Sequence, residues 1–327
     1  MIWVAWRQHR AQLTTLAALL LLGGAAVLVL HSSMTGYIEA HGLQACAAGR
    51  ELADGCGTPQ ARADFRKGWS GLLMAGKVVV LALPVVLGVF CAAPLFAREI
   101  EHGTHVLAFT QSVSRFQWMI TKVAVLLLPS AVVVVVLQFL VERWASAAGD
   151  LGSVVGNPFV FLSFDTTGPM PVAHLLFSFA AGAFLGVVAR RSLMAMATTF
   201  GALIALRVLV SGVDMKFLPV QRMISHDPAR SALSGSDELV VVRNGYLGPD
   251  GRDVPSSAVD LSACAPRPGV PEPDMGACYA QSGVTGQFAD VIQGTAAPGL
   301  QLAEFAVFGF AAVLLLVGTA WALQRQH

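Results

Sequence analysis

Apolar residues along the chain gather in six long runs that are separated by more polar segments. A bilayer core about 30 Å thick takes about 20 residues of helix at a rise of 1.5 Å per residue. The runs predict transmembrane helices over residues 13–30, 78–96, 120–141, 173–189, 193–213 and 302–323. The segments between them are 31–77, 97–119, 142–172 and 214–299. The fold class that follows is an all-α membrane protein with six transmembrane helices.

Composition agrees with this picture and excludes several classes of protein. Hydrophobic residues make up 55% of the chain and charged residues 13%. A typical soluble domain carries about a quarter charged residues. The net charge of +1 offers no general attraction for nucleic acid.

The first apolar run decides where the N-terminus lies. It follows Arg7 and Arg10, as the core of a signal peptide would, but it is long for such a core and no compact cleavage site ends it. We therefore expect a retained helix and a cytoplasmic N-terminus. Basic residues then fall mainly at short inner segments and acidic residues at the longer outer ones, as the positive-inside rule requires. Six spans place both termini in the cytoplasm.

The cysteines give an independent test of this topology. Cys46, Cys56, Cys264 and Cys278 fall in the two segments predicted to lie outside, and Cys91 falls in the second run. Disulfides persist in oxidising compartments, so these positions agree with the predicted orientation. Four cysteines allow three pairings. We favour the local pairs Cys46–Cys56 and Cys264–Cys278; four unpaired thiols are the alternative.

Residues 214–299 predict a small extracellular cap, either α/β or irregular. The stretch ELVVVRNGYLG contains a strand-like run followed by Asn244 and Gly245, a pair that favours a hairpin turn. The stretch CAPRPGVPEPDMGAC is rich in proline and glycine and predicts an irregular loop. A segment of this size supports a small ordered cap and not a large enzyme domain.

Motifs for catalysis and metal binding are weak. The stretch GLLMAGKV resembles a phosphate loop but lacks the Ser or Thr that would bind magnesium, so we interpret Lys77 as a residue whose ammonium reaches the membrane edge. His102 and His105 have ligand-like spacing, but no further ligand completes a set. Hydrolase and metalloprotease motifs do not occur in the sequence. We expect no catalytic residue and no metal.

Two features of the apolar runs indicate helix contacts. Arg207 is a basic residue within the fifth run, where a charge is unfavourable unless it faces protein or water. It is a candidate contact with a substrate path or a partner helix. The alternative is that its guanidinium reaches the outer membrane edge, or forms a salt bridge with Asp214 near the outer end of the span. Gly182 and Gly186 have the spacing that allows helices to approach closely, within the chain or across a dimer.

The segment between the second and third runs carries the most informative pattern. It reads REIEHGTHVLAFTQSVSRFQWMITK and holds aromatic residues that a solvated connector does not need. Its Glu-x-Glu-x-Gly-Thr, Leu-x-x-Thr, Ser–Arg pair and following Lys resemble the permease subunits of type-2 ATP-binding-cassette (ABC) transporters. The matching residues are Glu99, Glu101, Gly103, Thr104, Leu107, Thr110, Ser114, Arg115 and Lys122.

The N-terminal MIWVAWRQHR is similar to the interfacial elbow helix of these subunits, especially in actinobacterial members, and places such a helix at 1–12. The resemblance covers most of the chain, although 31–77 and 214–299 are larger than the minimal family pattern. It implies a cytoplasmic coupling helix within 97–119 that sits in a groove of a separate ATPase. The residues implied at that interface are Glu99, Glu101, Gly103, Thr104, Leu107, Thr110 and Arg115.

The resemblance also implies a function. The chain would be a transport subunit, not an enzyme, of an ABC exporter in the bacterial plasma membrane. Two permease chains, expected to form a homodimer, would pair with two ATPase subunits that bind ATP and Mg, while this chain binds no cofactor. Hydrophobic or amphipathic cargo would pass between the permeases or come from membrane lipid; nucleic acid would be no partner. The alternative is an ATP-independent transporter, or a membrane protein that senses a ligand through its extracellular cap.

Overall fold

The computed structural model describes residues 2–48, 56–103, 114–152, 159–211, 220–227, 239–259 and 275–325. Its contacts divide the chain into two units, which are described separately. The helical unit comprises Met1–Gly156, Val160–Val213 and Pro298–His327. The sheet unit comprises Asn157–Phe159 and Asp214–Ala297.

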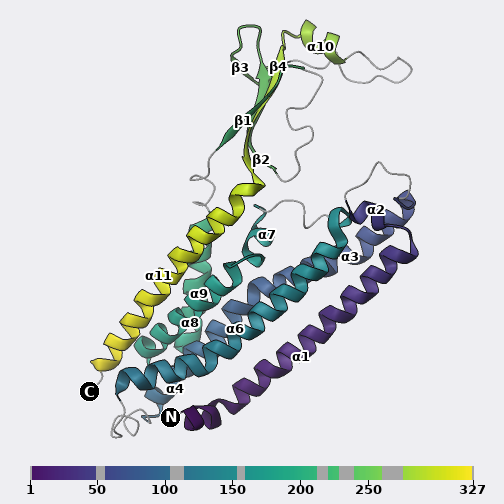
Figure 1. Ribbon diagram of the computed structural model, residues 1–327. Helices are drawn as coiled ribbons and strands as arrows, with labels where there is room; N and C mark the ends of the chain where they lie inside the picture. The colour runs from purple at the N-terminus through teal and green to yellow at the C-terminus, as the bar shows by residue number, and fades with distance from the viewer. Residues whose placement is uncertain are drawn as a thin grey trace. The chain divides into compact units, whose positions relative to one another are not determined.

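Long apolar helices make up most of the helical unit (Figure 1). They are α1 (Ile2–Ala40), α3 (Pro59–Leu87), α6 (Arg115–Ala148), α8 (Met170–Ala189), α9 (Ser192–Ser211) and α11 (Ala297–Gln324). Shorter elements connect them: α2 (Gln44–Ala47), the π-helical turn η1 (Gly88–Ala92), α4 (Ala93–Glu101), the 3-10 turn η2 (Gly149–Leu151) and α7 (Phe161–Thr166). Helix α1 packs mainly on α6, and α8 packs on α3, η1, α4 and α9. Side chains such as Phe96, Leu126 and Phe179 fill the core that these helices share.

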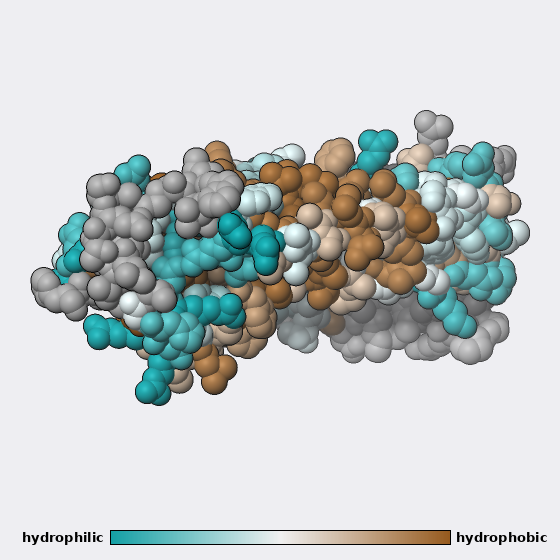
Figure 2. All heavy atoms as spheres, turned by 90° about the horizontal axis from the view of Figure 1, so that it is seen from below, coloured by the Kyte–Doolittle hydropathy of each residue, from teal (hydrophilic) through white to brown (hydrophobic). Residues whose placement is uncertain are grey.

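Five stretches of the described residues are long and apolar enough to cross a membrane. They are Trp6–Ala40, Pro59–Glu101, Arg115–Leu151, Met170–Ala189 and Gly294–Gln324, and α9 contributes the shorter apolar stretch Ser192–Leu206. The prediction of a mostly helical membrane protein is therefore confirmed, while the span predicted at 193–213 stays a prediction. Leu22, Leu128 and Phe310 are among the large apolar side chains exposed on these helices. Figure 2 shows a broad area of hydrophobic residues, in brown, of the kind that suits contact with lipid.

The helices continue past the predicted spans. Helix α1 runs unbroken from Ile2 to Ala40, so residues 2–12 continue directly into the helix of the first predicted span. Helix α3 begins at Pro59, where the Thr58 side chain accepts a hydrogen bond from a backbone N–H of the first turn and caps the helix. Hydropathy marks only the part of a helix that suits lipid, whereas the helix itself continues as long as capping and packing support it.

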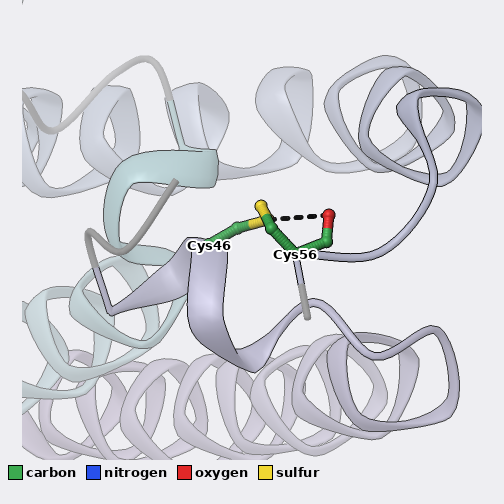
Figure 3. The surroundings of a disulfide bond; sticks show 2 residues. All are labelled: Cys46 and Cys56. Atoms are coloured by element: carbon green, nitrogen blue, oxygen red, sulfur yellow. Dashed lines mark hydrogen bonds between the residues drawn. A yellow bond between two sulfur atoms is a disulfide. The ribbon is translucent and has the colours of Figure 1, made fainter. Parts of the chain in front are cut away.

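The extended helix ends enclose a second core and a disulfide. Phe65, Leu73 and Trp144 are almost fully buried there, together with Cys46 and Cys56. Cys46 in α2 and Cys56 before α3 are joined by a disulfide bond (Figure 3). This local pair confirms the prediction, and the segment expected to be a polar loop is largely helical.

The structure shows the bonding state of two of the other three cysteines. Cys278 is disulfide-bonded. Cys264 lies outside the described residues, so the pair Cys264–Cys278 stays a prediction. Cys91 is a buried free thiol in η1.

The sheet unit contains a four-stranded antiparallel sheet of order β1-β4-β2-β3. The strands are β1 (Gln221–Ser225), β2 (Leu239–Leu247), β3 (Asp253–Pro255) and β4 (Gly286–Gln293); η4 (Ser256–Ala258), α10 (Met275–Gln281) and η6 (Gly294–Ala296) complete the unit. Asp253 forms ion pairs with Arg222 and Arg243. The hydrogen bond from Arg222 is the main cause that lowers the pKa of the Asp253 carboxyl. The described part of residues 214–299, predicted from the sequence to be α/β or irregular, therefore contains an antiparallel sheet.

The hairpin turn lies at a different place from the predicted one. Strand β2 runs through Asn244 and Gly245, and the turn to β3 follows it, with Gly251 at a φ of +71°. A Cβ at Gly245 would lie 2.8 Å from the Val254 carbonyl oxygen and 2.9 Å from the Phe288 ring. The Asn-Gly pair was therefore wrong as a turn signal, because this glycine allows a close approach inside the sheet.

Candidate functional site

Glu99 joins three helices at one end of the helical unit. Its carboxylate, on α4, accepts a hydrogen bond from the side-chain amide of Gln8 on α1 and forms an ion pair with Lys122 on α6. The Lys122 ammonium also lies over the Trp118 ring, 4.5 Å from its centroid. The Glu99 and Lys122 side chains are largely buried, and removal of one partner from such a pair leaves an uncompensated charge.

Glu101 ends α4 and caps the start of α9. Its Oε2 accepts hydrogen bonds from the Ser192 backbone N–H at 3.0 Å and from the Ser192 hydroxyl at 2.7 Å. The first N–H groups of a helix have no partner within the helix, and the helix dipole favours a negative charge there. The carboxylate of one helix therefore satisfies the N-terminus of another.

Arg115 begins α6 and binds the end of α11. Its Nη1 donates hydrogen bonds to the backbone oxygens of Leu323 and Gln324, each at 3.0 Å. The last carbonyls of a helix lack partners within it and favour a cation. Sequence reasoning assigned Arg115 to a partner protein and missed this contact, because 208 residues separate it from Leu323.

The middle of the predicted coupling segment lies outside the described residues. Thr104, Leu107 and Thr110 fall there, so the coupling helix itself stays a prediction. Gly103, the last described residue before it, has a φ of +69°, and a Cβ there would meet no atom within 4 Å. The described residues contain no group of three or more His, Cys, Asp or Glu that could hold a metal ion, and His105 is not among them.

The small residues of α8 lie against η1 and α4 of the same chain. A Cβ at Gly182 would lie 2.6 Å from the Gly88 carbonyl oxygen, and one at Gly186 would lie 2.5 Å from the Ala93 carbonyl oxygen. Both glycines therefore allow the backbones to approach closely within the chain. Arg207 lies on α9, but its side chain is outside the described part of the structure, so its proposed contacts stay untested.

A mostly apolar cavity of about 340 Å³ lies between α3, α7, α8, α9 and α11. Its walls include the rings of Phe161, Phe177, Phe200 and Phe308. His174 and Ser178 are the polar members of its described lining, and both lie on α8. The Ser178 hydroxyl donates a hydrogen bond to the Pro84 carbonyl oxygen at 2.7 Å. The shape and polarity suit a hydrophobic molecule.

Polar side chains from three long helices hold the segment around α7 next to this cavity. The Lys77 ammonium on α3 donates to the Ser163 hydroxyl at 2.8 Å, and the Gln301 amide on α11 donates to the Phe164 carbonyl oxygen at 2.9 Å. The Gln138 amide on α6 donates to the Gly168 carbonyl oxygen at 2.7 Å. Lys77 is only 5% exposed. A segment far along the chain therefore supplies a partner for the Lys77 ammonium inside the protein, and its position at the membrane edge stays a prediction.

Ionisable side chains lie beside the cavity. Asp165 is fully buried, and its Oδ1 lies 4.0 Å from Nε2 of His174. The His174 ring meets Phe308 edge-on, with centroids 5.1 Å apart. Glu304 is buried one helical turn before Phe308. Sequence reasoning did not connect these residues, since each is isolated in its own segment; a polar residue within or beside an apolar run is the signal that could have found them.

Comparison with known proteins agrees with this picture. A family model described as "ABC-2 membrane transporter related" matches residues 17–213, more than half of the chain. The chain belongs to this family. No curated protein and no solved structure matches it. As a member of the ABC-2 membrane transporter related family, the protein is a multi-pass membrane protein of a kind that is typically a non-catalytic permease and generally has an ATPase partner.

The family match covers much of the candidate site. Helices α3, α4, α8 and α9, the Glu101 cap and most of the cavity wall fall within the matched residues of this ABC-2 related chain. Helix α11 and strands β1 to β4 lie beyond them. Phe308 therefore adds to the cavity wall from outside the family match.

Proposed function

We propose that the chain is the membrane-spanning permease subunit of an ATP-driven ABC exporter. The observation that carries this proposal is the set of contacts at the two described ends of segment 97–119. Glu99 binds side chains on α1 and α6, Glu101 caps α9, and Arg115 binds the end of α11. A displacement of this one segment would therefore reach helices throughout the helical unit. Membership of an ABC-2 related family supports an ATPase as the source of that displacement.

In the proposed assembly, two permease chains form a homodimer and pair with two separate ATPase subunits. ATP and Mg bind to the ATPases, and this chain binds no cofactor. Segment 97–119 would provide the coupling helix that sits in a groove of the ATPase. Closure of the ATPases would favour one of two conformations of the permease, which is a population shift driven by differential affinity.

The proposed cargo is hydrophobic or amphipathic. The support for this class is the cavity between α3, α8, α9 and α11, whose wall is formed largely by aliphatic and aromatic side chains. The proposed location is the bacterial plasma membrane with both termini in the cytoplasm. The disulfide between Cys46 and Cys56 supports an outer location for the segment between α1 and α3.

The test is reconstitution with the ATPase encoded by the neighbouring reading frame. We expect the two proteins to purify together and to export a hydrophobic dye only when ATP is present. Glu101→Arg replaces the carboxylate that caps α9 with a cation, and it should abolish most of the export. Glu39→Arg makes the same change on an exposed residue of α1 and is the matched control.

Two results would contradict the proposal. One is unchanged assembly and unchanged export in both Glu101→Arg and Gly103→Trp, which would remove the coupling role of this segment. The other is export at the same rate without the ATPase, which would favour the ATP-independent transporter instead.

A further inference from the structure

We propose that the cavity binds a hydrocarbon chain that enters sideways from the lipid. The proposal deepens the proposed function and rests on it only for the claim that the bound chain is cargo. The site itself is built from residues of one chain, so binding needs neither a second permease nor an ATPase.

The cavity is elongated along the helices that form it. Its lining on α3 has the spacing i, i+3, i+4, i+7 and i+8, which is one stripe along a helix. The residues of this stripe are Val78, Leu81, Ala82, Val85 and Val86. At 1.5 Å per residue the stripe is about 12 Å long. A spanning helix is tilted from the membrane normal by only about 20° on average, so the stripe suits an extended chain that lies as lipid chains do.

A second stripe faces the cavity from α9. Phe200, Leu203 and Ile204 repeat the spacing i, i+3 and i+4 on this helix. Helices α3 and α9 both pack on α8, which contributes Phe177 and Ser178 to the lining. The cavity therefore has two apolar walls with α8 between them.

One side of the cavity is closed, and the other is open at the depth of the membrane. Leu203 is buried, whereas Ala82 and Ile204 are exposed. Ala82 belongs to the stretch Pro59–Glu101, which is long and apolar enough to cross a membrane, and Ile204 belongs to the apolar stretch Ser192–Leu206. Exposed apolar side chains in such stretches suit contact with lipid. The mouth of the cavity thus opens toward the hydrocarbon of the bilayer.

The polar side chains of the described lining already contact other parts of the chain. The Ser178 hydroxyl donates to the Pro84 carbonyl oxygen at 2.7 Å. The His174 ring lies 4.0 Å from Asp165 and meets Phe308 edge-on. The rest of the described lining is aliphatic or aromatic. A polar group would lose its hydration against this wall, whereas a hydrocarbon chain that comes from lipid has none to lose.

Dispersion contacts would supply the affinity. Lipid chains are as apolar as the wall, so transfer from lipid by itself gains little. An empty cavity leaves the atoms of its wall without neighbours on one side, and a chain that lies along both stripes restores these contacts. A flexible chain adapts to the space between two helices, while a rigid ring system fits only where the shapes match. We therefore expect a moderate preference for chains over rings.

Photo-crosslinking in nanodiscs tests the site. The purified full chain is reconstituted in phosphatidylcholine with a trace of one diazirine probe. The three probes are a phospholipid labelled in the middle of an acyl chain, a free fatty acid labelled at the same carbon, and a rigid sterol. Mass spectrometry compares the labelling of residues 78–86 and 200–206 with that of residues 19–29 on the lipid-facing side of α1.

We expect one or both chain probes to label the cavity residues at least about threefold more than α1, the ratio that a few additional dispersion contacts provide. The sterol should show a smaller ratio. Labelling by the phospholipid would identify membrane lipid as the source of the chain, and labelling by the fatty acid alone would identify a free chain. Equal labelling of cavity and α1 by both chain probes, or a sterol ratio as large as theirs, would overturn the proposal.

Two substitutions locate the bound chain. Ala82→Trp and Ile204→Trp fill the cavity from its two walls and should remove the excess labelling. Ala25→Trp places the same ring on an exposed position of α1 and should leave the excess unchanged. Each variant is compared as the fraction that elutes like the wild type. Loss of the excess in either cavity variant supports the site, whereas persistence in both would place the chain elsewhere and overturn it.

The two proposals fail in different ways. If the chain probes label the cavity but no ATPase drives export, the exporter assignment fails and the cavity remains a site for hydrocarbon chains. If ATP-driven export holds but the cavity shows no excess labelling, the exporter assignment stands and the inference about the cavity fails.

Discussion

Gly186 shows how a single missing methyl group sets the distance between two helices. A Cβ there would lie 2.5 Å from the Ala93 carbonyl oxygen, and this neighbour is backbone that cannot rotate away. Gly201, on α9, has no such neighbour, because a Cβ there would meet no atom within 4 Å. The two glycines both lie inside apolar helices, so they form a matched pair.

We expect Gly186→Ala to destabilise the protein and Gly201→Ala to leave it equal or slightly more stable. Overpacking of a close contact costs about 1–3 kcal/mol, while alanine removes some of the conformational entropy that glycine loses on folding. Thermal unfolding of the two variants in the same detergent measures the difference. Equal unfolding midpoints would contradict this expectation, because they would show that α8 and α4 can move apart without a loss of stability.

At the scale of helices, polar side chains at the two described ends of segment 97–119 cap helices other than their own. The described start of α9 uses the Glu101 carboxylate from α4, and the described end of α11 uses the Arg115 guanidinium from α6. Local caps such as Thr58 on α3 stabilise one helix only. A cap from another helix also makes the two helices move together, which suits a protein that transmits a displacement.

Loss of the Glu101 carboxylate should loosen the start of α9. Glu101→Ala removes both hydrogen bonds to Ser192, and we expect severalfold faster hydrogen exchange at the first-turn amides of α9. Glu101→Gln keeps an acceptor without the charge and should have a smaller effect. Hydrogen exchange with mass spectrometry measures both, and the first turn of α8 is the internal control. Unaltered exchange in Glu101→Ala would mean that the cap does not stabilise α9.

At the scale of the whole molecule, the Cys46–Cys56 disulfide tests topology and stability together. A bridge that closes a loop of this length stabilises a protein by about 3 kcal/mol in the chain-entropy model. We expect reduction to lower the unfolding midpoint of the wild type by more than that of a variant with both Cys46→Ser and Cys56→Ser, in which the disulfide of Cys278 is still present. In intact cells, a thiol-trapping reagent should modify neither cysteine before reduction. Free thiols at both positions in cells would contradict an outer location for this segment.

The sequence by itself determined the membrane class, the approximate position of the apolar helices, the Cys46–Cys56 pair and the family. These properties depend on local composition or short spacing: an apolar run favours a helix in lipid wherever it occurs, and two nearby cysteines can reach each other. Local sequence patterns give wrong predictions where contacts with distant parts of the chain determine the backbone conformation. Asn244 and Gly245 form a good turn pair, but the contact of Gly245 with Phe288 keeps them inside a strand.

The tertiary structure alone decided how far the helices extend and which polar residues meet. Phe65 on α3 and Trp144 on α6 lie outside the predicted apolar spans, yet both belong to the same buried core beyond those spans. Lys77 meets Ser163 across 86 residues, and Gln301 meets Phe164 across 137. A lone polar residue in one segment gives no sign of its partner in another. Burial makes the partnership necessary, because a polar group inside the protein is stable only when it is paired.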